Sequence, residues 1–185
     1  MYRRAAVGSA WLLGLAIFFA SQSAMAAMIT TVIESDSIQI GESTSIQIFL
    51  DLEAGEEASI FEGTFDMTGA TTVEVIYVEP SEEWDSAFGG IFGNAIEVSL
   101  TSNNMGGLRL VAEVEVEGLV LGTYQILLGF DTYAERDLDV PPFFEDIPIS
   151  NSLGSVLASV AVVPEPGTAL LLGAGLIGFG LRRRN

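Results

Sequence analysis

Four carboxylates within nine residues are the side chains of this sequence best suited to holding a metal ion. They are Asp131, Glu135, Asp137 and Asp139, on a segment that we expect to form a loop. Oxygen ligands at alternating positions suit Ca²⁺, although the spacing is not that of an EF-hand and no glycine stands at the sixth position. Because runs of charge are often simply solvated, the segment is either a calcium site or an acidic stretch of surface.

Trp84 stands in a second segment that is rich in acids and aromatic rings. Glu82, Glu83 and Asp85 flank it, and Phe88 follows shortly after. Surfaces that bind sugars combine these residue types, so Trp84 is a candidate for ligand contact. The alternative is that its large apolar ring fills the edge of the protein core.

Histidine and cysteine are absent from the whole sequence. Their absence excludes Ser-His-Asp and Cys-His nucleophiles, ordinary zinc sites, c-type haem and iron–sulfur clusters, and it leaves no disulfide to stabilise the fold. A pair of the 25 acids is in principle enough for glycoside hydrolysis. Because no acid–base motif is recognisable, the sequence indicates a protein that is not an enzyme, with no cofactor apart from the candidate calcium.

Acidic side chains far outnumber basic ones between the two ends of the chain. All 25 acids lie between Glu34 and Glu165, where Arg109 and Arg136 are the only cations, so this region carries a net charge of −23. Such a field repels nucleic acid and anionic lipid and keeps the chain soluble. A nucleic-acid function is therefore excluded.

Alternation of apolar and polar residues dominates the same region. Because a strand turns successive side chains to opposite faces, these patterns and short apolar runs predict eight or so strands. No stretch has a convincing helical period, although a short helix near residues 80–88 is an option. We therefore expect an all-β fold, an antiparallel jelly-roll β-sandwich over residues 27–162. The segments are 46–52, 61–67, 73–78, 96–101, 108–117, 125–130 and 156–163.

The alternation also assigns the two faces of each strand. Apolar residues on one phase should be buried between the sheets, whereas Glu113 and Glu115 on the other phase should face water. The residues expected to be buried are Ile46, Ile48, Leu50, Leu108, Leu110, Val114 and Val116.

The order of four segments resembles the cohesin-like sandwiches of bacterial surface proteins. The segments are residues 40–48, 58–67, 107–116 and 122–124. The resemblance implies the architecture of the domain. It does not imply dockerin binding, because Asp66-Met67 departs from the Tyr-Asp-Pro that is usual in the second segment.

The first 26 residues have the three parts of a secretory signal peptide. The Arg3-Arg4 pair is basic, residues 5–20 are apolar, and Ala24 and Ala26 are the small residues expected before a cleavage site. We expect export by the Sec pathway, because the residues after the arginine pair lack the twin-arginine pattern. Signal peptidase should then cut before Ala27.

The last 23 residues also have three parts. The Val163-Pro164-Glu165-Pro166 segment should be extended, because proline fixes φ and lacks an amide donor. Residues 167–181 carry no ionisable side chain and would form a helix of about 22 Å, short of the roughly 30 Å hydrocarbon core. A buried core helix is the alternative. The basic Arg182-Arg183-Arg184 run favours a short transmembrane helix whose C-terminal end faces the cytoplasm.

This three-part tail resembles the PEP-CTERM sorting signal of exported proteins in Gram-negative bacteria. The resemblance implies that exosortase, a membrane protease-transpeptidase, acts near Pro164-Glu165-Pro166 while the chain is transiently anchored in the inner membrane. It predicts a protein of the cell surface or extracellular matrix, associated with exopolysaccharide or biofilm. The alternatives are a module that binds a specific glycan or protein and, more remotely, a small glycoside-active enzyme.

Overall fold

The computed structural model describes residues 26–138, 143–167 and 170–174. Within them the chain forms twelve strands, and five of these lie outside the segments expected from the sequence: Ala27–Ile33, Ser37–Gln39, Ser86–Phe92, Tyr133–Asp137 and Phe144–Ile147. Three of the five are only three to five residues long and show no clear period. In chain order the strands are β1 (Ala27–Ile33), β2 (Ser37–Gln39), β3 (Ser43–Leu52), β4 (Glu57–Thr68), β5 (Val73–Pro80), β6 (Ser86–Phe92), β7 (Ala95–Gly106), β8 (Leu108–Gly118), β9 (Gly122–Leu128), β10 (Tyr133–Asp137), β11 (Phe144–Ile147) and β12 (Val156–Val163).

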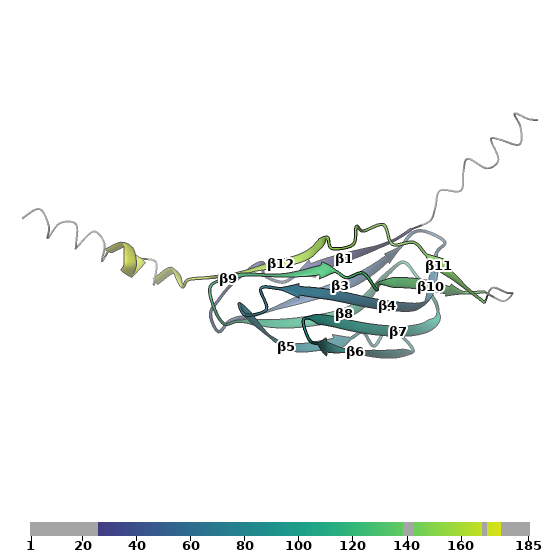
Figure 1. Ribbon diagram of the computed structural model, residues 1–185, viewed down its shortest axis with the longest axis horizontal. Coiled ribbons are helices and arrows are strands. Elements are labelled where there is room, and N and C mark those ends of the chain that lie inside the picture. The colour runs from purple at the N-terminus through teal and green to yellow at the C-terminus, as the bar shows by residue number, and fades with distance from the viewer. Residues whose placement is uncertain (1–25, 139–142, 168–169, 175–185) are drawn as a thin grey trace, which may run out of the picture.

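The strands form two sheets, which confirms the predicted all-β sandwich (Figure 1). The smaller sheet has the order β1-β3-β8-β5, and the larger one runs β11-β10-β4-β9-β12-β2. Strand β4 is the centre of the larger sheet, because it pairs with β7 along one edge and with β10 and β9 along the other. Strand β6 extends this sheet beyond β7. Among the described strands, the pairs are antiparallel except that of β12 with β2.

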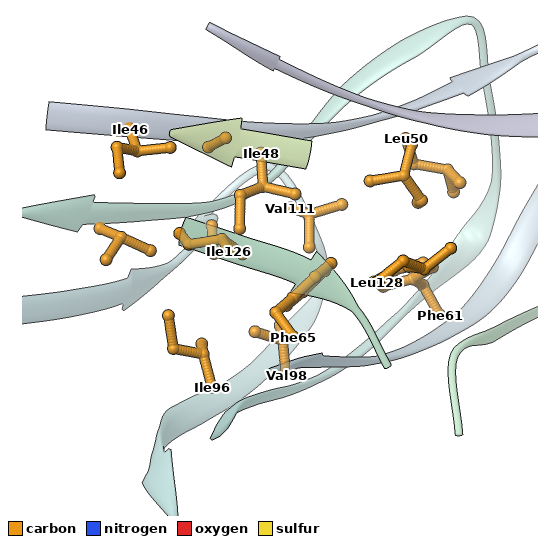
Figure 2. Close-up of a cluster of buried hydrophobic side chains, with 14 of the residues drawn as sticks. Ile46, Ile48, Leu50, Phe61, Phe65, Ile96, Val98, Val111, Ile126 and Leu128 are labelled. Carbon is orange, nitrogen blue, oxygen red and sulfur yellow. The ribbon is translucent and has the colours of Figure 1, made fainter. Parts of the chain in front are cut away.

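Side chains from both sheets fill the space between them (Figure 2). From β3, Ile46, Ile48 and Leu50 are fully buried, as predicted. They meet phenylalanine side chains of β4 and aliphatic side chains of β7 and β9. Since burying each large apolar side chain contributes about 1.5–3 kcal/mol, this core stabilises a domain that has no disulfide.

A β-bulge interrupts the alternation in β8. The register with β3 places Ile48 opposite Ala112 but Phe49 opposite Leu110, so Val111 is the extra residue. An extra residue in one strand reverses which face the following side chains occupy. The residues before and after Val111 therefore follow opposite phases.

The bulge makes part of the predicted burial pattern wrong. Val111 is fully buried, whereas Leu108 is 57% exposed and Leu110 is half-buried, so the last two do not belong to the core. Beyond the bulge the prediction is confirmed, because Val114 and Val116 are fully buried.

Two predictions about loops and helices are also wrong. No helix lies near residues 80–88, because β5 continues to Pro80 and β6 begins at Ser86. The segment expected to form a loop after Asp131 contains β10, which pairs with β4 on one side and β11 on the other. Short, charged strands such as β10 depend on these neighbours rather than on an apolar pattern of their own.

Candidate functional site

One row of side chains crosses the outer surface of the larger sheet. The registers place Phe88 of β6 beside Ser99 of β7, Ser99 beside Glu62 of β4, and Glu62 beside Tyr133 of β10. Side chains that are directly opposite in a sheet point to the same face. Four strands, β6, β7, β4 and β10, thus bring an aromatic ring, a carboxylate and a phenol onto one surface.

Two exposed phenylalanines form the apolar part of this surface. Phe88 is 65% exposed and Phe92 is 47% exposed, and their ring centroids are 6.3 Å apart. They are four residues apart in β6, so they share a face, and Gly90 between them adds no side chain. We call Phe88, Phe92, Glu62, Glu97 and Tyr133 the Phe88 face.

The Phe88 face contains a hollow of about 300 Å³. Glu62, Glu97 and Asp131 contribute carboxylates to its lining, and Phe88 forms part of its wall. None of the residues that line the hollow is a cation. The hollow therefore favours a positively charged group with an apolar neighbour.

Tyr133 is tied to this carboxylate cluster. Its hydrogen bond with Glu62, helped by slight burial and by the charges of Glu62 and Glu135, raises the pKa of Tyr133 to about 12. The phenol therefore stays neutral at physiological pH and donates to Glu62. This contact keeps the Glu62 side chain at the surface of the sheet.

The three candidate calcium residues that the structure describes lie on a loop and a strand. Glu135 and Asp137 lie in β10, Asp131 lies in the preceding loop, and Asp139 lies outside the described residues. Between them, Arg136 binds Glu145, and its Nη1 atom is 3.5 Å from Glu56. In the part of the chain that the structure describes, no group of three or more acids could hold a metal ion.

Trp84 fills the edge of the core, the alternative raised by its sequence. The side chain is only 4% exposed, and its Nε1–H donates to the carbonyl of Leu110 at 3.0 Å. A buried indole offers no ring face to a sugar, so the structure does not support ligand contact through Trp84. Its neighbours Glu82 and Glu83 line a separate hollow of about 500 Å³ with Leu110 and Glu113.

The Pro-Glu-Pro segment follows directly on the sandwich. Val163 is the last residue of β12 and pairs with Gln39, whereas Pro164, Glu165 and Pro166 are exposed. The predicted extended segment ends one residue early, because Pro166 starts a helix. Proline suits the first helical position, where its missing N–H would have no partner anyway.

The membrane helix predicted for residues 167–181 is covered only in part. Among the described residues, no helix has the length and apolar character that crossing a membrane requires. Residues 168–169 and 175–185, including Arg182-Arg183-Arg184, lie outside the described part. The same holds for the predicted signal peptide up to residue 25, Ala24 included.

Comparison with protein families identifies the tail. Residues 162–184 match the model of the PEP-CTERM protein-sorting motif. The chain carries a PEP-CTERM sorting motif. Its Pro164-Glu165-Pro166 core, the residues to which the resemblance assigned the motif, is the exposed segment after β12. The PEP-CTERM motif implies export by the exosortase pathway of Gram-negative bacteria.

Solved structures identify the fold of the body. A type I cohesin from the ScaB protein of Pseudobacteroides cellulosolvens is 12% identical, with a TM-score of 0.59 over 75% of this chain and 94% of the cohesin. A type I cohesin–dockerin complex from Clostridium thermocellum gives 12% identity and a TM-score of 0.59 over 76% and 96%. A non-cellulosomal cohesin from Archaeoglobus fulgidus gives 13% and 0.54 over 77% and 96%. The likeness confirms the cohesin-like sandwich. No curated protein sequence matches the chain.

Sequence reasoning missed most of the Phe88 face. In the sequence, Phe88 is a candidate only as a neighbour of Trp84, and Phe92, Glu97 and Tyr133 are not candidates. A signal was present, since Phe88 and Phe92 have the even spacing of side chains on one strand face. The pairing of β6, β7, β4 and β10, which assembles the face, has no signature in a single sequence.

Proposed function

We propose that the chain is an exported, non-catalytic module that binds a protein partner at the cell surface or in the extracellular matrix. The observation that carries the proposal is the Phe88 face, an open sheet surface on which exposed rings stand among carboxylates. Delivery through the PEP-CTERM motif includes an inner-membrane anchor formed by residues 167–181, cleavage by exosortase near Pro164-Glu165-Pro166, and final residence in an exopolysaccharide or biofilm matrix.

The chemistry of the Phe88 face defines the partner. Exposed aromatic rings are typical anchors of protein interfaces. The carboxylates of Glu62, Glu97 and Asp131 favour a segment that carries lysine or arginine beside apolar side chains. Some cohesins of the same fold are known in complex with dockerins, which supports a protein partner over a glycan. Burial of Trp84 also argues against a sugar-stacking site.

Paired variants test this proposal. This protein, purified from the producing bacterium, would be used as bait to capture its partner protein. The affinity between the two would then be measured by calorimetry. Phe88→Ser combined with Phe92→Ser should weaken binding at least about tenfold, because rings near the centre of an interface carry much of its energy. Val32→Ser is the matched control, since Val32 is 56% exposed but lies on β1 of the other sheet.

The dependence of affinity on salt concentration is an independent test of the same interface. Affinity should fall as ionic strength rises, since the carboxylates of the face attract a cationic partner. If the affinity changes neither in the double variant nor with ionic strength, the interface lies elsewhere. Absence of any saturable protein binding would leave a purely structural matrix role.

A further inference from the structure

Four exposed apolar side chains gather at the end of the sandwich from which the tail leaves. Leu119, Val120 and Leu121 form the loop between β8 and β9, and Ile40 lies in the turn between β2 and β3. Their exposed fractions are 42%, 58%, 51% and 54%, respectively. We call these four residues the exit-end cluster. Figure 1 shows that β12 runs into the tail at this end, where β9 begins.

Tight backbone packing joins the exit-end cluster to the last residues of β12. A Cβ atom on Gly118 would lie 2.7 Å from the carbonyl oxygen of Gln39 and 3.0 Å from a methyl group of Val162. Gly122, at the other end of the loop, pairs with Val162. Ile40 forms a β-bridge with Gly118. These contacts hold the exit-end cluster beside the last residues of β12, where the tail starts.

Hydrogen bonds hold the loop in place. The N–H groups of Leu119 and Val120 both donate to the carbonyl of Thr72, at 2.8 and 3.1 Å. The loop itself carries no charge. In the neighbouring turn, the carboxylate of Glu42 accepts a hydrogen bond from the N–H of Gln39 at 2.8 Å. This bond holds the carboxylate against the backbone of the turn. The apolar side chains thus project from a braced backbone.

The apolar tail sequence begins within a short reach of this cluster. Gly167 is four residue steps beyond Val163, and an extended chain spans at most about 3.6 Å per residue, or about 14 Å in all. If residues 167–181 enter a bilayer, the loop tips at this end of the sandwich are therefore kept close to its surface.

We propose that the exit-end cluster rests on the lipid surface while the tail anchors the unprocessed precursor. This inference rests on the proposed function, because it requires the tail to be in the membrane. Apolar loops bind at the boundary between headgroups and acyl chains. Because the region between the two ends carries a net charge of −23, the partner surface is zwitterionic rather than anionic lipid. Contact at this end would hold Pro164-Glu165-Pro166 beside the bilayer, within reach of a membrane protease.

Spin labels on the full-length precursor can test the contact. The chain has no cysteine, so Val120→Cys and Leu108→Cys each give a single labelling site. The two positions are equally exposed, at 58% and 57%, but Leu108 starts β8 whereas Val120 follows its end. Each labelled precursor would be reconstituted into vesicles of phosphatidylethanolamine and phosphatidylcholine. The accessibility of the label to oxygen, which partitions into lipid, would be compared with that to a water-soluble nickel complex.

We expect an oxygen-to-nickel ratio several-fold higher at position 120 than at position 108, and a smaller difference when phosphatidylglycerol is added. Equal ratios in a precursor that floats with the vesicles would overturn the lipid contact and leave tail-mediated delivery standing. Spin–spin broadening between copies at position 120 would also overturn it, because a second copy would then cover the cluster. A precursor that does not float with the vesicles would contradict both the anchor and the contact.

Discussion

Tyr124 is fully buried in the core, yet its hydroxyl group has no hydrogen-bond partner among the described residues. An unsatisfied buried hydroxyl costs about 1–3 kcal/mol. We therefore expect Tyr124→Phe to leave the free energy of unfolding unchanged or to raise it by up to about 1 kcal/mol, as measured by urea denaturation. A loss of more than about 1 kcal/mol would mean that the hydroxyl has a partner, such as a buried water.

The same variant should change the response to alkaline pH. Burial raises the pKa of Tyr124 well above the ordinary value of a tyrosine. A group whose pKa is raised by folding contributes stability that is complete below its unfolded pKa and is lost as pH rises. Stability should therefore fall less steeply above pH 10 in Tyr124→Phe than in the natural protein. Tyr133, with its pKa of about 12, is common to both proteins and cancels in the comparison.

The bulge in β8 gives two adjacent apolar residues different degrees of burial. Val111 is fully buried, whereas Leu110 is half-buried at the rim of a hollow. Val111→Ala should therefore cost about 2 kcal/mol of unfolding free energy. Leu110→Ala should cost less than about 1 kcal/mol, although it removes a larger side chain. Urea denaturation of the two variants decides the matter, and the reverse order would contradict the bulge.

At the scale of elements, β1 and the tail differ in their access to proteases. Ala27 starts β1, is fully buried, and its N–H donates to the carbonyl of Pro148 at 2.9 Å. If signal peptidase cuts before Ala27, folding hides the bond that must be cut. By contrast, Pro164, Glu165 and Pro166 stay exposed after the sandwich has formed.

We therefore expect signal-peptide removal to precede folding, whereas processing of the tail can follow it. Precursor that is folded before purified signal peptidase is added should remain uncut, and precursor presented unfolded should be cut. As a control for the folded state, proteinase K should trim the folded precursor at residues 164–167 and leave β1 to β12 intact. Rapid cleavage before Ala27 in the folded precursor would show that β1 opens readily.

Features that depend on a local alternation of apolar and polar residues are predictable from the sequence, whereas features that depend on long-range strand pairing are not. The strand β3 was predictable because Ile46, Ile48 and Leu50 alternate with polar residues and pair without interruption up to Ile48. The bulge in β8 was not, because Leu110 and Val111 are both apolar and either could face the core. Strand β10 is not predictable from the sequence, because its acids and arginine show no apolar face.

The candidate functional sites show the same difference between local sequence features and long-range strand pairing. The PEP-CTERM motif was readable because all its parts are contiguous in the sequence. The Phe88 face was not, because it combines residues of β6, β7, β4 and β10 through registers that depend on the whole sheet. Trp84 was ambiguous in the sequence, since only the position of Leu110 shows that the indole has a buried hydrogen-bond acceptor.

For the whole molecule, unbalanced charge should limit stability. The region between the ends has a net charge of −23, and the ion pairs among the described residues involve only Arg136, with Glu56 and Glu145. Self-repulsion is screened as ionic strength rises, with a Debye length of about 10 Å at 0.1 M. The melting temperature should therefore rise with sodium chloride, and a fall would contradict this electrostatic account.

Calcium at matched ionic strength is the control that separates screening from binding. Equal shifts from calcium and sodium would mean screening alone. A further increase with calcium would support a site that includes Asp131 and Asp139, because a ligand that binds the folded state stabilises it.

The intact mass of the extracellular protein tests the central claim, that this is a folded module delivered through a PEP-CTERM tail. The measurement needs only the protein that the bacterium releases, without tags or substitutions. We expect a form that begins at Ala27 and ends in or near Pro164-Glu165-Pro166, because that segment is exposed and joins the sandwich to the apolar residues beyond. An extracellular form whose mass still includes Arg182-Arg183-Arg184 would contradict the account.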